Sequence, residues 1–333
     1  MVPEQPLVER FRRDLDALAA PDSRIGIAVS GGPDSLALLL LAASARPSRV
    51  EAATVDHALR PGSRAEAEQV AEICRRLGVP HATLTAAWKE WPETAIQERA
   101  RSVRYRLLGD WAGERGLDAI VTAHHLDDQA ETVLMRLARG AGVRGLAGMR
   151  AESVAPGTTV PLLRPLLGWS HAELERLCAS AGIDPVRDPS NEDARFERVR
   201  IRNALGSIAE LDPSAIAESA AHLGDADAAL DWAADREWQR AVSDSDAAIV
   251  YDPSGTPSEI RRRIVSRIIL ALAAEGEAAE LRGRELDRVI AALATGRAAT
   301  LRGVLCTGGS EWRFTPAPTR RVGASAEIRP VEG

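Results

Sequence analysis

Apolar and polar positions alternate between strand-like and helix-like patterns over roughly the first 185 residues. Short apolar runs of strand length are separated by longer segments with helical spacing. The predicted strands are residues 25–29, 50–55, 82–84, 119–123 and 160–163. Strands that alternate with helices through short connections form parallel sheets covered on both faces. We therefore expect an α/β fold with a doubly wound, mainly parallel five-stranded sheet.

The pattern changes after about residue 210. Helical spacing returns at residues 258–274 and 280–294, and residues 300–316 are typical of a short hairpin. Asp212-Pro213-Ser214 marks the expected junction. The sequence thus predicts a first domain over residues 1–210 and a smaller, mostly helical domain over 211–333. Residues 140–157 carry five glycines and little periodicity, which predicts a long loop of the kind that forms lids and binding loops.

A glycine turn follows the first predicted strand. It consists of Ser30, Gly31, Gly32, Pro33, Asp34 and Ser35. Proline suits the first helical turn, so the segment is typical of a strand, a tight turn and a helix N-terminus. Free backbone N–H groups and the positive end of the helix dipole then point at one place, which predicts an anion site. Asp34 beside a phosphate indicates Mg²⁺ between them, bound directly or through water.

Other polar residues follow the second and fourth predicted strands. His57 and Arg60 come directly after residues 50–55, and His124 follows residues 119–123. In an open parallel sheet, ligands bind at the carboxyl ends of the strands. Asp128 and Glu131 are three residues apart at the start of a predicted helix, so both carboxylates lie on one face. Such a pair suits an ammonium group, while a metal site and a purely structural role are the alternatives.

Arginine dominates the basic residues of this chain. The formal net charge is −6, and Lys89 is the single lysine among 42 basic residues. A P-loop lysine after the glycines is therefore excluded, and backbone, hydroxyl and arginine groups must bind any phosphate. Arg195, Arg198 and Arg202 have the spacing of one helix stripe, for which nucleic-acid phosphates are the natural partner. Arg104 lies on the predicted helix that precedes the fourth strand, from which it could reach the crevice.

The cysteine spacing and the hydropathy pattern indicate which classes of protein this chain does not resemble. Cys74, Cys178 and Cys306 are widely separated and form no CxxC pair, so neither a zinc site nor a disulfide framework is indicated. The longest apolar run, residues 36–43, is too short to span a bilayer. The N-terminus lacks the pattern of a signal peptide. We expect a cytoplasmic protein with no membrane partner, and the oligomeric state is open, with a homodimer as one arrangement to test.

Several motifs together resemble those of a known family. SGGPDS resembles the PP-loop of the N-type ATP pyrophosphatases. VDHALR, AHHLDDQAET, RPLL and DPSN with the arginines after it follow in the order found in tRNA(Ile)-lysidine synthases. The resemblance covers residues 24 to about 205, and the chain is similar to the shorter form of the family.

The resemblance implies a ligase that uses ATP and Mg²⁺. It would adenylate the wobble cytidine of isoleucine tRNA with a CAU anticodon, and free L-lysine would then displace AMP to give lysidine. By the same resemblance, the residues from Ser30 to Ser35 with His57 and Arg60 would bind ATP. Asp34, Arg104 and His124 would be catalytic, Asp128 and Glu131 would bind lysine, and Arg195, Arg198 and Arg202 would contact tRNA.

Three other functions compete with this one. A PP-loop tRNA thiolase generally needs paired cysteines or an iron–sulfur cluster, which the isolated cysteines do not favour. A small-molecule ligase with the same ATP fold would not need the arginines after residue 191. A non-catalytic adenine-nucleotide-binding protein would have no use for two carboxylates facing the crevice. The acidic net charge also means that tRNA must bind through local arginine patches.

Overall fold

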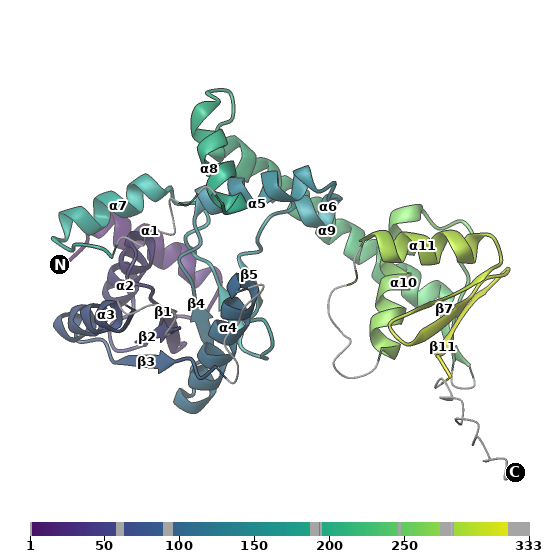
Figure 1. The fold of residues 1–333 in the computed structure, drawn as a ribbon, viewed down its shortest axis with the longest axis horizontal. Helices are drawn as coiled ribbons and strands as arrows, with labels where there is room; N and C mark the ends of the chain where they lie inside the picture. Colours follow the sequence, from purple (N-terminus) through teal and green to yellow (C-terminus); the bar gives the residue numbers. More distant parts are fainter. Residues whose placement is uncertain are drawn as a thin grey trace, which may run out of the picture. The chain divides into compact units, whose positions relative to one another are not determined.

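The structure is a computed structural model that describes residues 2–57, 63–88, 96–186, 193, 195–245, 248–273, 281 and 283–318. The chain divides into two compact units, Met1–Gly224 and Asp225–Gly333 (Figure 1). The division falls within the long helix α9 (Pro213–Ala241), which begins at the predicted junction. Of the helices in the described ranges, none is long and apolar enough to cross a membrane.

A six-stranded sheet forms the centre of the first unit. Its order is β3-β2-β1-β4-β6-β5. The strands are β1 (Ile25–Ala28), β2 (Val50–Asp56), β3 (His81–Thr85), β4 (Ala119–Val121), β5 (Glu152–Val154) and β6 (Pro161–Leu163). All neighbours are parallel except β5, which pairs antiparallel with β6. The five predicted strands are confirmed as β1, β2, β3, β4 and β6.

Residues 140–157 do not form a single irregular loop, so that expectation was wrong. They contain the short helix α6 (Val143–Leu146) and strand β5. Strand β5 is three residues long and has no strong apolar alternation, because it lies at the sheet edge and pairs with β6 alone. Its stability comes from that backbone pairing, which a hydropathy pattern does not record.

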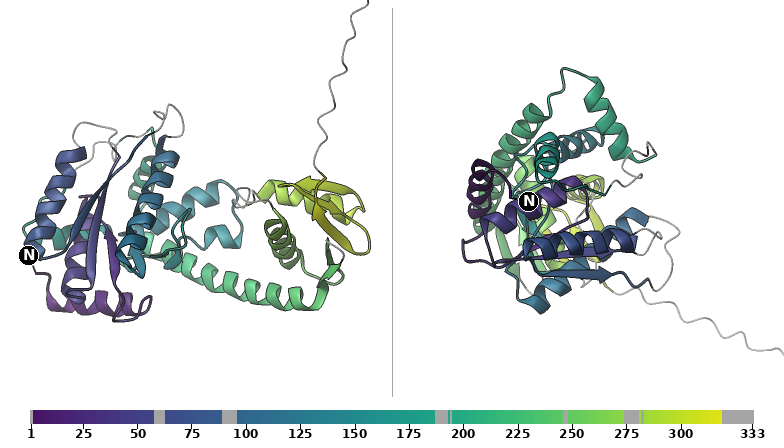
Figure 2. Two further views of the ribbon diagram at one scale, coloured as in Figure 1. Left: turned by 90° about the horizontal axis from the view of Figure 1, so that it is seen from below. Right: turned by 90° about the vertical axis from the view of Figure 1, so that its left-hand side faces the viewer.

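Helices cover both faces of this sheet, as a doubly wound fold requires (Figures 1 and 2). Besides α6 and the first part of α9, the helices of the first unit are α1 (Gln5–Asp16), α2 (Pro33–Ala45), α3 (Ser63–Leu77), α4 (Ile96–Arg115), α5 (Leu126–Ala138), α7 (His171–Ser180) and α8 (Glu197–Ser207). One core joins α1, α2, α3 and α7 to the sheet, and a second core places α4 on the other face. Successive strand residues alternate between the two cores, as Leu162 and Leu163 do on β6.

The second unit combines helices with a sheet of its own. Helices α10 (Ser258–Leu272) and α11 (Gly283–Ala294) confirm two predicted helices. A five-stranded antiparallel sheet has the order β7-β8-β11-β10-β9. Its strands are β7 (Val242–Ser245), β8 (Ala248–Tyr251), β9 (Ala298–Leu301), β10 (Val304–Thr307) and β11 (Trp312–Pro316). The sequence predicted only the β10–β11 hairpin of this sheet and missed β7, β8 and β9, which are four residues long each.

Candidate active site

The sheet order creates a cavity beside the end of β1. The chain runs from β1 outward to β2 and β3, and then returns to the other side of β1 with β4. Ligands bind at such a switch point in open parallel sheets. A cavity of about 720 Å³ lies there, wholly within the first unit. Ten of the predicted site residues are among those that line it: Ser30, Gly32, Pro33, Asp34, Ser35, His57, Arg104, His124, Asp128 and Arg198.

The glycine turn has the geometry of a phosphate loop. Gly31 has φ of +86°, a conformation that glycine adopts without strain, and its carbonyl accepts a hydrogen bond from Val186 N at 2.9 Å. Gly32 is the N-cap of α2 and Pro33 stands in its first turn. The Ser35 hydroxyl accepts a hydrogen bond from Ser30 N and donates one to the Gly32 carbonyl, at 3.1 and 2.9 Å. The turn is thus held by its own serines and presents the N-terminus of α2 to the cavity.

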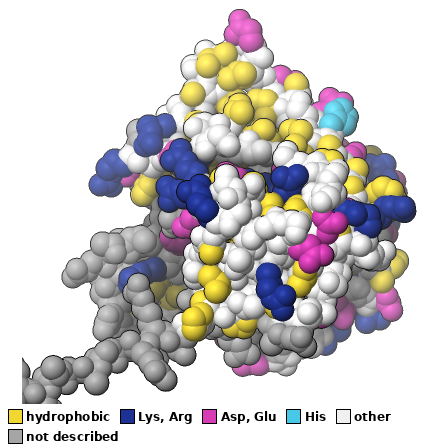
Figure 3. Space-filling view, turned by 90° about the vertical axis from the view of Figure 1, so that its right-hand side faces the viewer, with side chains coloured by type: hydrophobic (Ala, Val, Ile, Leu, Met, Phe, Trp, Pro, Cys, Tyr) yellow, Lys and Arg dark blue, Asp and Glu magenta, His cyan; other side chains and the backbone are white. Residues whose placement is uncertain are grey.

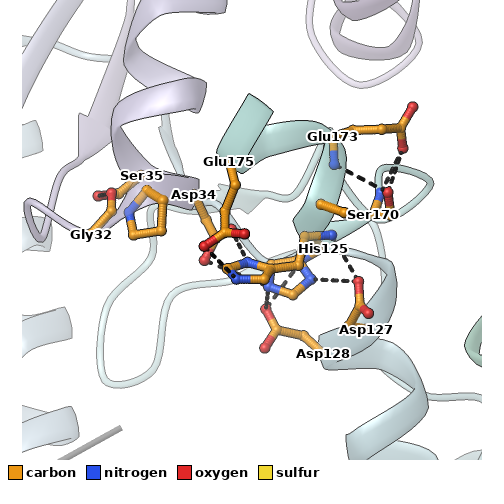
Figure 4. A network of polar contacts seen from close by, with 12 residues as sticks. Gly32, Asp34, Ser35, His125, Asp127, Asp128, Ser170, Glu173 and Glu175 are labelled. Atoms are coloured by element: carbon orange, nitrogen blue, oxygen red, sulfur yellow. Dashed lines mark hydrogen bonds and ion pairs between the residues drawn. The ribbon is translucent and has the colours of Figure 1, made fainter. Parts of the chain in front are cut away.

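Asp34 lies between two histidines in a polar network (Figure 4). His171 Nδ1 is 2.7 Å from Asp34 Oδ1, and His125 Nε2 is 3.6 Å from Asp34 Oδ2. Burial opposes ionisation of Asp34, but the two histidines outweigh it and hold the pKa of Asp34 well below its usual range. Burial also opposes the charge on His125, yet Asp127, Asp34 and Asp128 raise its pKa to about 10. The hydrogen bond to Asp34 raises the pKa of His171 as well.

Two further carboxylates support these histidines. Asp127 Oδ2 accepts a hydrogen bond from the backbone N of His171 at 2.8 Å and lies 3.4 Å from His125 Nδ1. Glu175 Oε1 lies 3.4 Å from His171 Nε2, on the outer side of the ring. Asp127 thereby holds the start of α7 against the start of α5. This contact positions His171, the first residue of α7, beside Asp34.

His57, directly after β2, and Arg104, on α4, line the cavity. Neither ring nitrogen of His57 has a hydrogen-bond partner among the described residues, although both nitrogens are buried. Burial, with a contribution from the Arg104 charge, lowers the pKa of His57 to about 4. Loss of hydration in the cavity also lowers the pKa of Arg104. Buried polar atoms are normally hydrogen-bonded, so an imidazole left without partners here is suited to a bound ligand.

His124 follows β4 and stays uncharged at neutral pH. Its Nδ1 is 2.9 Å from the Thr122 hydroxyl. Burial lowers its pKa to about 4, although the Asp128 carboxylate acts in the opposite direction. A neutral imidazole in the cavity wall can accept a proton, which a histidinium cannot.

The two carboxylates that we expected to bind an ammonium group already have cationic partners. Arg198 Nε and Arg202 Nε each lie 2.6 Å from one oxygen of Glu131. Arg198 Nη2 also lies 3.0 Å from Asp128 Oδ1. Only 1% of the Glu131 side chain is exposed, and Glu131 does not line the cavity, whereas Asp128 does. The structure therefore joins two sets of residues that the sequence treated as separate sites.

The expected arginine stripe is not continuous. Helix α8 begins at Glu197, so Arg195 lies before the helix and pairs with Asp193 at 2.6 Å. The spacing rule failed because it assumed that the helix had already begun at residue 195. Among the described residues, Figure 3 shows basic side chains in separate groups on the face it presents. Arg60 and residues 188–191 lie outside the described residues.

Comparison with known proteins agrees with this geometry. The family model described as a PP-loop domain matches residues 6–208. A tRNA(Ile)-lysidine synthase of Novosphingobium aromaticivorans is 49% identical, with 94% of each chain covered. One of Zymomonas mobilis is 42% identical, with 91% of this chain and 92% of the relative covered. The chain belongs to the tRNA(Ile)-lysidine synthase family.

A solved structure supports the fold of this lysidine synthase family member. The U34-tRNA thiolase NcsA from Methanococcus maripaludis, solved with its [4Fe-4S] cluster, superposes with a TM-score of 0.54. The match covers 66% of this chain and 78% of the thiolase at 16% identity. At that identity the likeness concerns the PP-loop fold alone.

In this lysidine synthase family member, three side chains near the phosphate turn are close enough together to hold a metal ion. Asp34, His125 and His171 each offer one ligand atom, and these atoms lie within 4.8 Å of one another. Mg²⁺ prefers oxygen ligands and is usually held by one or two carboxylates with substrate phosphates. Asp34, beside the N-terminus of α2, fits that requirement, and the two imidazoles are better suited to orienting its carboxylate.

From the sequence, His125 was considered only for the alternative metal site, and His171 was missed. His125 is the N-cap of α5 in the connection that follows β4, next to His124, and His171 opens α7 after β6. Both lie in segments that follow the carboxyl ends of strands. The rule that ligands bind at these ends had already identified His57 and His124. Applied to the fifth predicted strand, the same rule would have pointed to His171.

Proposed function

We propose that this chain ligates L-lysine to C2 of the wobble cytidine in isoleucine tRNA with a CAU anticodon. The cytidine O2 attacks the α-phosphorus of ATP, and pyrophosphate leaves as the α–β phosphoanhydride bond breaks. The ε-amine of lysine then attacks C2, and AMP leaves with the former O2. The single observation that carries this proposal is one cavity lined both by the phosphate turn and by Asp128.

The phosphate turn would bind the part of ATP that departs. Phosphoryl transfer depends mainly on positioning and on neutralising developing charge. The N-terminus of α2 and the Ser30 and Ser35 hydroxyls supply donors for the pyrophosphate, and Asp34 would hold Mg²⁺. When bound, Mg²⁺ would neutralise phosphate charge. His57, whose ring nitrogens lack described partners, would hydrogen-bond to the nucleotide, and Arg60 stays a predicted ATP ligand.

Arg104 and His124 would act at the reacting atoms. A guanidinium without water around it stabilises negative charge more strongly than one in bulk solvent, which suits Arg104 to the adenylation step. Lysine must lose a proton from its ε-ammonium group before it attacks. With a pKa of about 4, His124 is neutral at pH 7, and a neutral imidazole can accept that proton as it leaves in the transition state.

Asp128 and Glu131 would bind the ammonium group of lysine, and Arg195, Arg198 and Arg202 would contact the tRNA backbone. Arg195 is 86% exposed, and Arg198 and Arg202 are 40% and 49% exposed, so phosphates can reach all three. The second unit would help bind tRNA. We place the reaction in the cytoplasm, and a homodimer stays a prediction.

A tRNA thiolase is the main alternative, and its chemistry meets an obstacle in this chain. Cys74, Cys178 and Cys306 are all buried. Burial raises the pKa of each thiol to about 12, which leaves almost no thiolate at neutral pH. Sulfur transfer needs an accessible thiolate or a cluster held by several cysteines. The carboxylates near the cavity favour an amine nucleophile instead.

Incorporation of radiolabelled L-lysine into an unmodified isoleucine tRNA transcript, with ATP and Mg²⁺, tests the proposal. The elongator methionine tRNA shares the CAU anticodon and is the control. Label in the isoleucine tRNA and not in the methionine tRNA is the expected result. ATP cleavage to AMP and pyrophosphate without labelled RNA would mean that another nucleophile is used. No ATP cleavage at all would favour a nucleotide-binding protein without catalysis.

A further inference from the structure

Four charged side chains between α5 and α8 form a nearly neutral cluster. Glu131 and Asp128 come from α5, and Arg198 and Arg202 come from α8. Both Glu131 oxygens and one Asp128 oxygen accept guanidinium N–H groups, at 2.6 to 3.0 Å. Two guanidiniums and two carboxylates have no net charge. An ammonium group that approaches this cluster therefore meets little of the negative potential that the carboxylates alone would provide.

Because Glu131 is buried, its pairing with the two arginines controls whether any other cation can reach its oxygens. Its side chain is 1% exposed, so a ligand can reach its oxygens only if at least one arginine moves away. A buried carboxylate that loses one partner must gain another, because an unpaired buried charge is costly. Lysine and the arginines of α8 thus compete for the same oxygen atoms.

The side chains of Arg198 and Arg202 are also partly exposed to solvent. Arg198 and Arg202 are bound to the carboxylates mainly through Nε, and 40% and 49% of their side chains remain exposed. Guanidinium groups bind phosphate through paired N–H groups. A nucleic-acid backbone at this surface would draw the two arginines toward its phosphates and away from Glu131.

We propose that Arg198 and Arg202 couple RNA binding to lysine binding. In the RNA-free protein they occupy the carboxylates, and RNA phosphates take them up as the ε-ammonium group of lysine takes their place on Glu131 and Asp128. This inference rests on the proposed function. Linkage is reciprocal, so lysine must tighten RNA binding by the same factor by which RNA tightens lysine binding.

The first test uses the unaltered full chain. The Kd of L-lysine is measured by calorimetry without ATP, once alone and once with saturating isoleucine tRNA transcript. We expect lysine to bind at least about tenfold more tightly with the transcript, within the usual range of coupling between sites. Equal affinities, or weaker binding with RNA, would overturn the proposal.

Two variants test whether the arginines that contact Glu131 are responsible for the coupling. Arg202→Gln removes one guanidinium from Glu131, so lysine should bind more tightly without RNA and the effect of RNA should shrink. Arg139→Gln is the matched control, because Arg139 also links α5 to α8, through Glu197, without contacting either carboxylate. It should leave the lysine Kd unchanged. An Arg202→Gln variant that folds and behaves like Arg139→Gln would contradict the assignment.

The outcomes separate this inference from the function it rests on. If lysidine forms but the lysine Kd is the same with and without RNA, the proposed coupling is wrong and the proposed function is retained. If lysine binds under neither condition and no lysidine forms, both are wrong. A purely structural role for the ion pairs would lower the melting temperature of Arg202→Gln without changing the RNA dependence of the lysine Kd.

Discussion

His171 Nδ1 donates a hydrogen bond to Asp34 Oδ1 across 2.7 Å. The bond joins the first turn of α2 to the first residue of α7, and these residues are 137 positions apart in the sequence. It fixes the direction of the carboxylate at the edge of the phosphate turn. Asp34 is therefore an oriented, ionised group before any nucleotide binds, which is the state that charge neutralisation through Mg²⁺ requires.

Replacing Asp34 should stop the first chemical step. In Asp34→Asn the carboxylate is lost but the shape is kept, so we expect AMP formation to fall by about 100-fold or more, as when a group that stabilises a transition state is removed. Pyrophosphate release measures this step. Glu175→Gln is the control, because Glu175 lies against Nε2 of His171, whereas Asp34 is bound by Nδ1. Near-normal pyrophosphate release by Asp34→Asn would remove Asp34 from the mechanism.

Asp128→Asn should act on the second step. Asp128 lines the cavity, and a hydrogen bond from an ammonium group to a carboxylate contributes more than one to a neutral amide. We expect the KM for lysine to rise by about tenfold, which corresponds to about 1.4 kcal/mol of lost binding. The KM for ATP in the same assay serves as the internal reference. Should the lysine KM stay the same while the ATP KM rises, Asp128 belongs to the nucleotide site.

The histidine cluster predicts a pH dependence of stability. The pKa of His125 is about 10 in the folded protein against an ordinary histidine value of 6.5, so the folded state binds more protons between these pH values. The contribution is fully present below pH 6.5 and is lost as the pH rises toward 10, by at most about 1.4 kcal/mol per pH unit. Urea unfolding of the wild type and of His125→Gln at pH 6, 7.5 and 9 measures it. The variant should lose less stability over this range, and parallel curves would disprove the assignment.

An ion-pair cluster in the second unit predicts a large effect on stability. Arg263 is 6% exposed and contacts Asp227, Asp231 and Glu259 at 2.6 to 3.0 Å. Arg263→Ala leaves the buried Asp227 without this partner, so we expect a loss of about 3 to 5 kcal/mol. Arg267→Ala, which breaks an exposed pair with Asp235, should cost less than about 1 kcal/mol. Thermal unfolding followed by calorimetry compares the two variants, and equal losses would contradict the role of burial.

The predicted parts of the fold were those with a local physical cause. The strands β1, β2, β4 and β6 are short apolar runs because they are buried on both faces, and the turn from Ser30 to Ser35 is defined by glycine and proline conformations. Strand β5 and the strands β7, β8 and β9 of the second unit were missed. These strands are three or four residues long, and backbone pairing with neighbouring strands stabilises them, which local hydropathy does not record.

The sequence by itself determined which chemical groups stand at the ends of the strands, because strand ends follow from local hydropathy and the direction of parallel strands is shared. It thereby placed Asp34, His57, His124 and Asp128 around one cavity. Only the tertiary structure decided the partners of these groups. His171 reaches Asp34 because α7 packs against α2, and Arg198 and Arg202 reach Glu131 because α8 packs against α5. Contacts between separate helices depend on packing that no local pattern encodes.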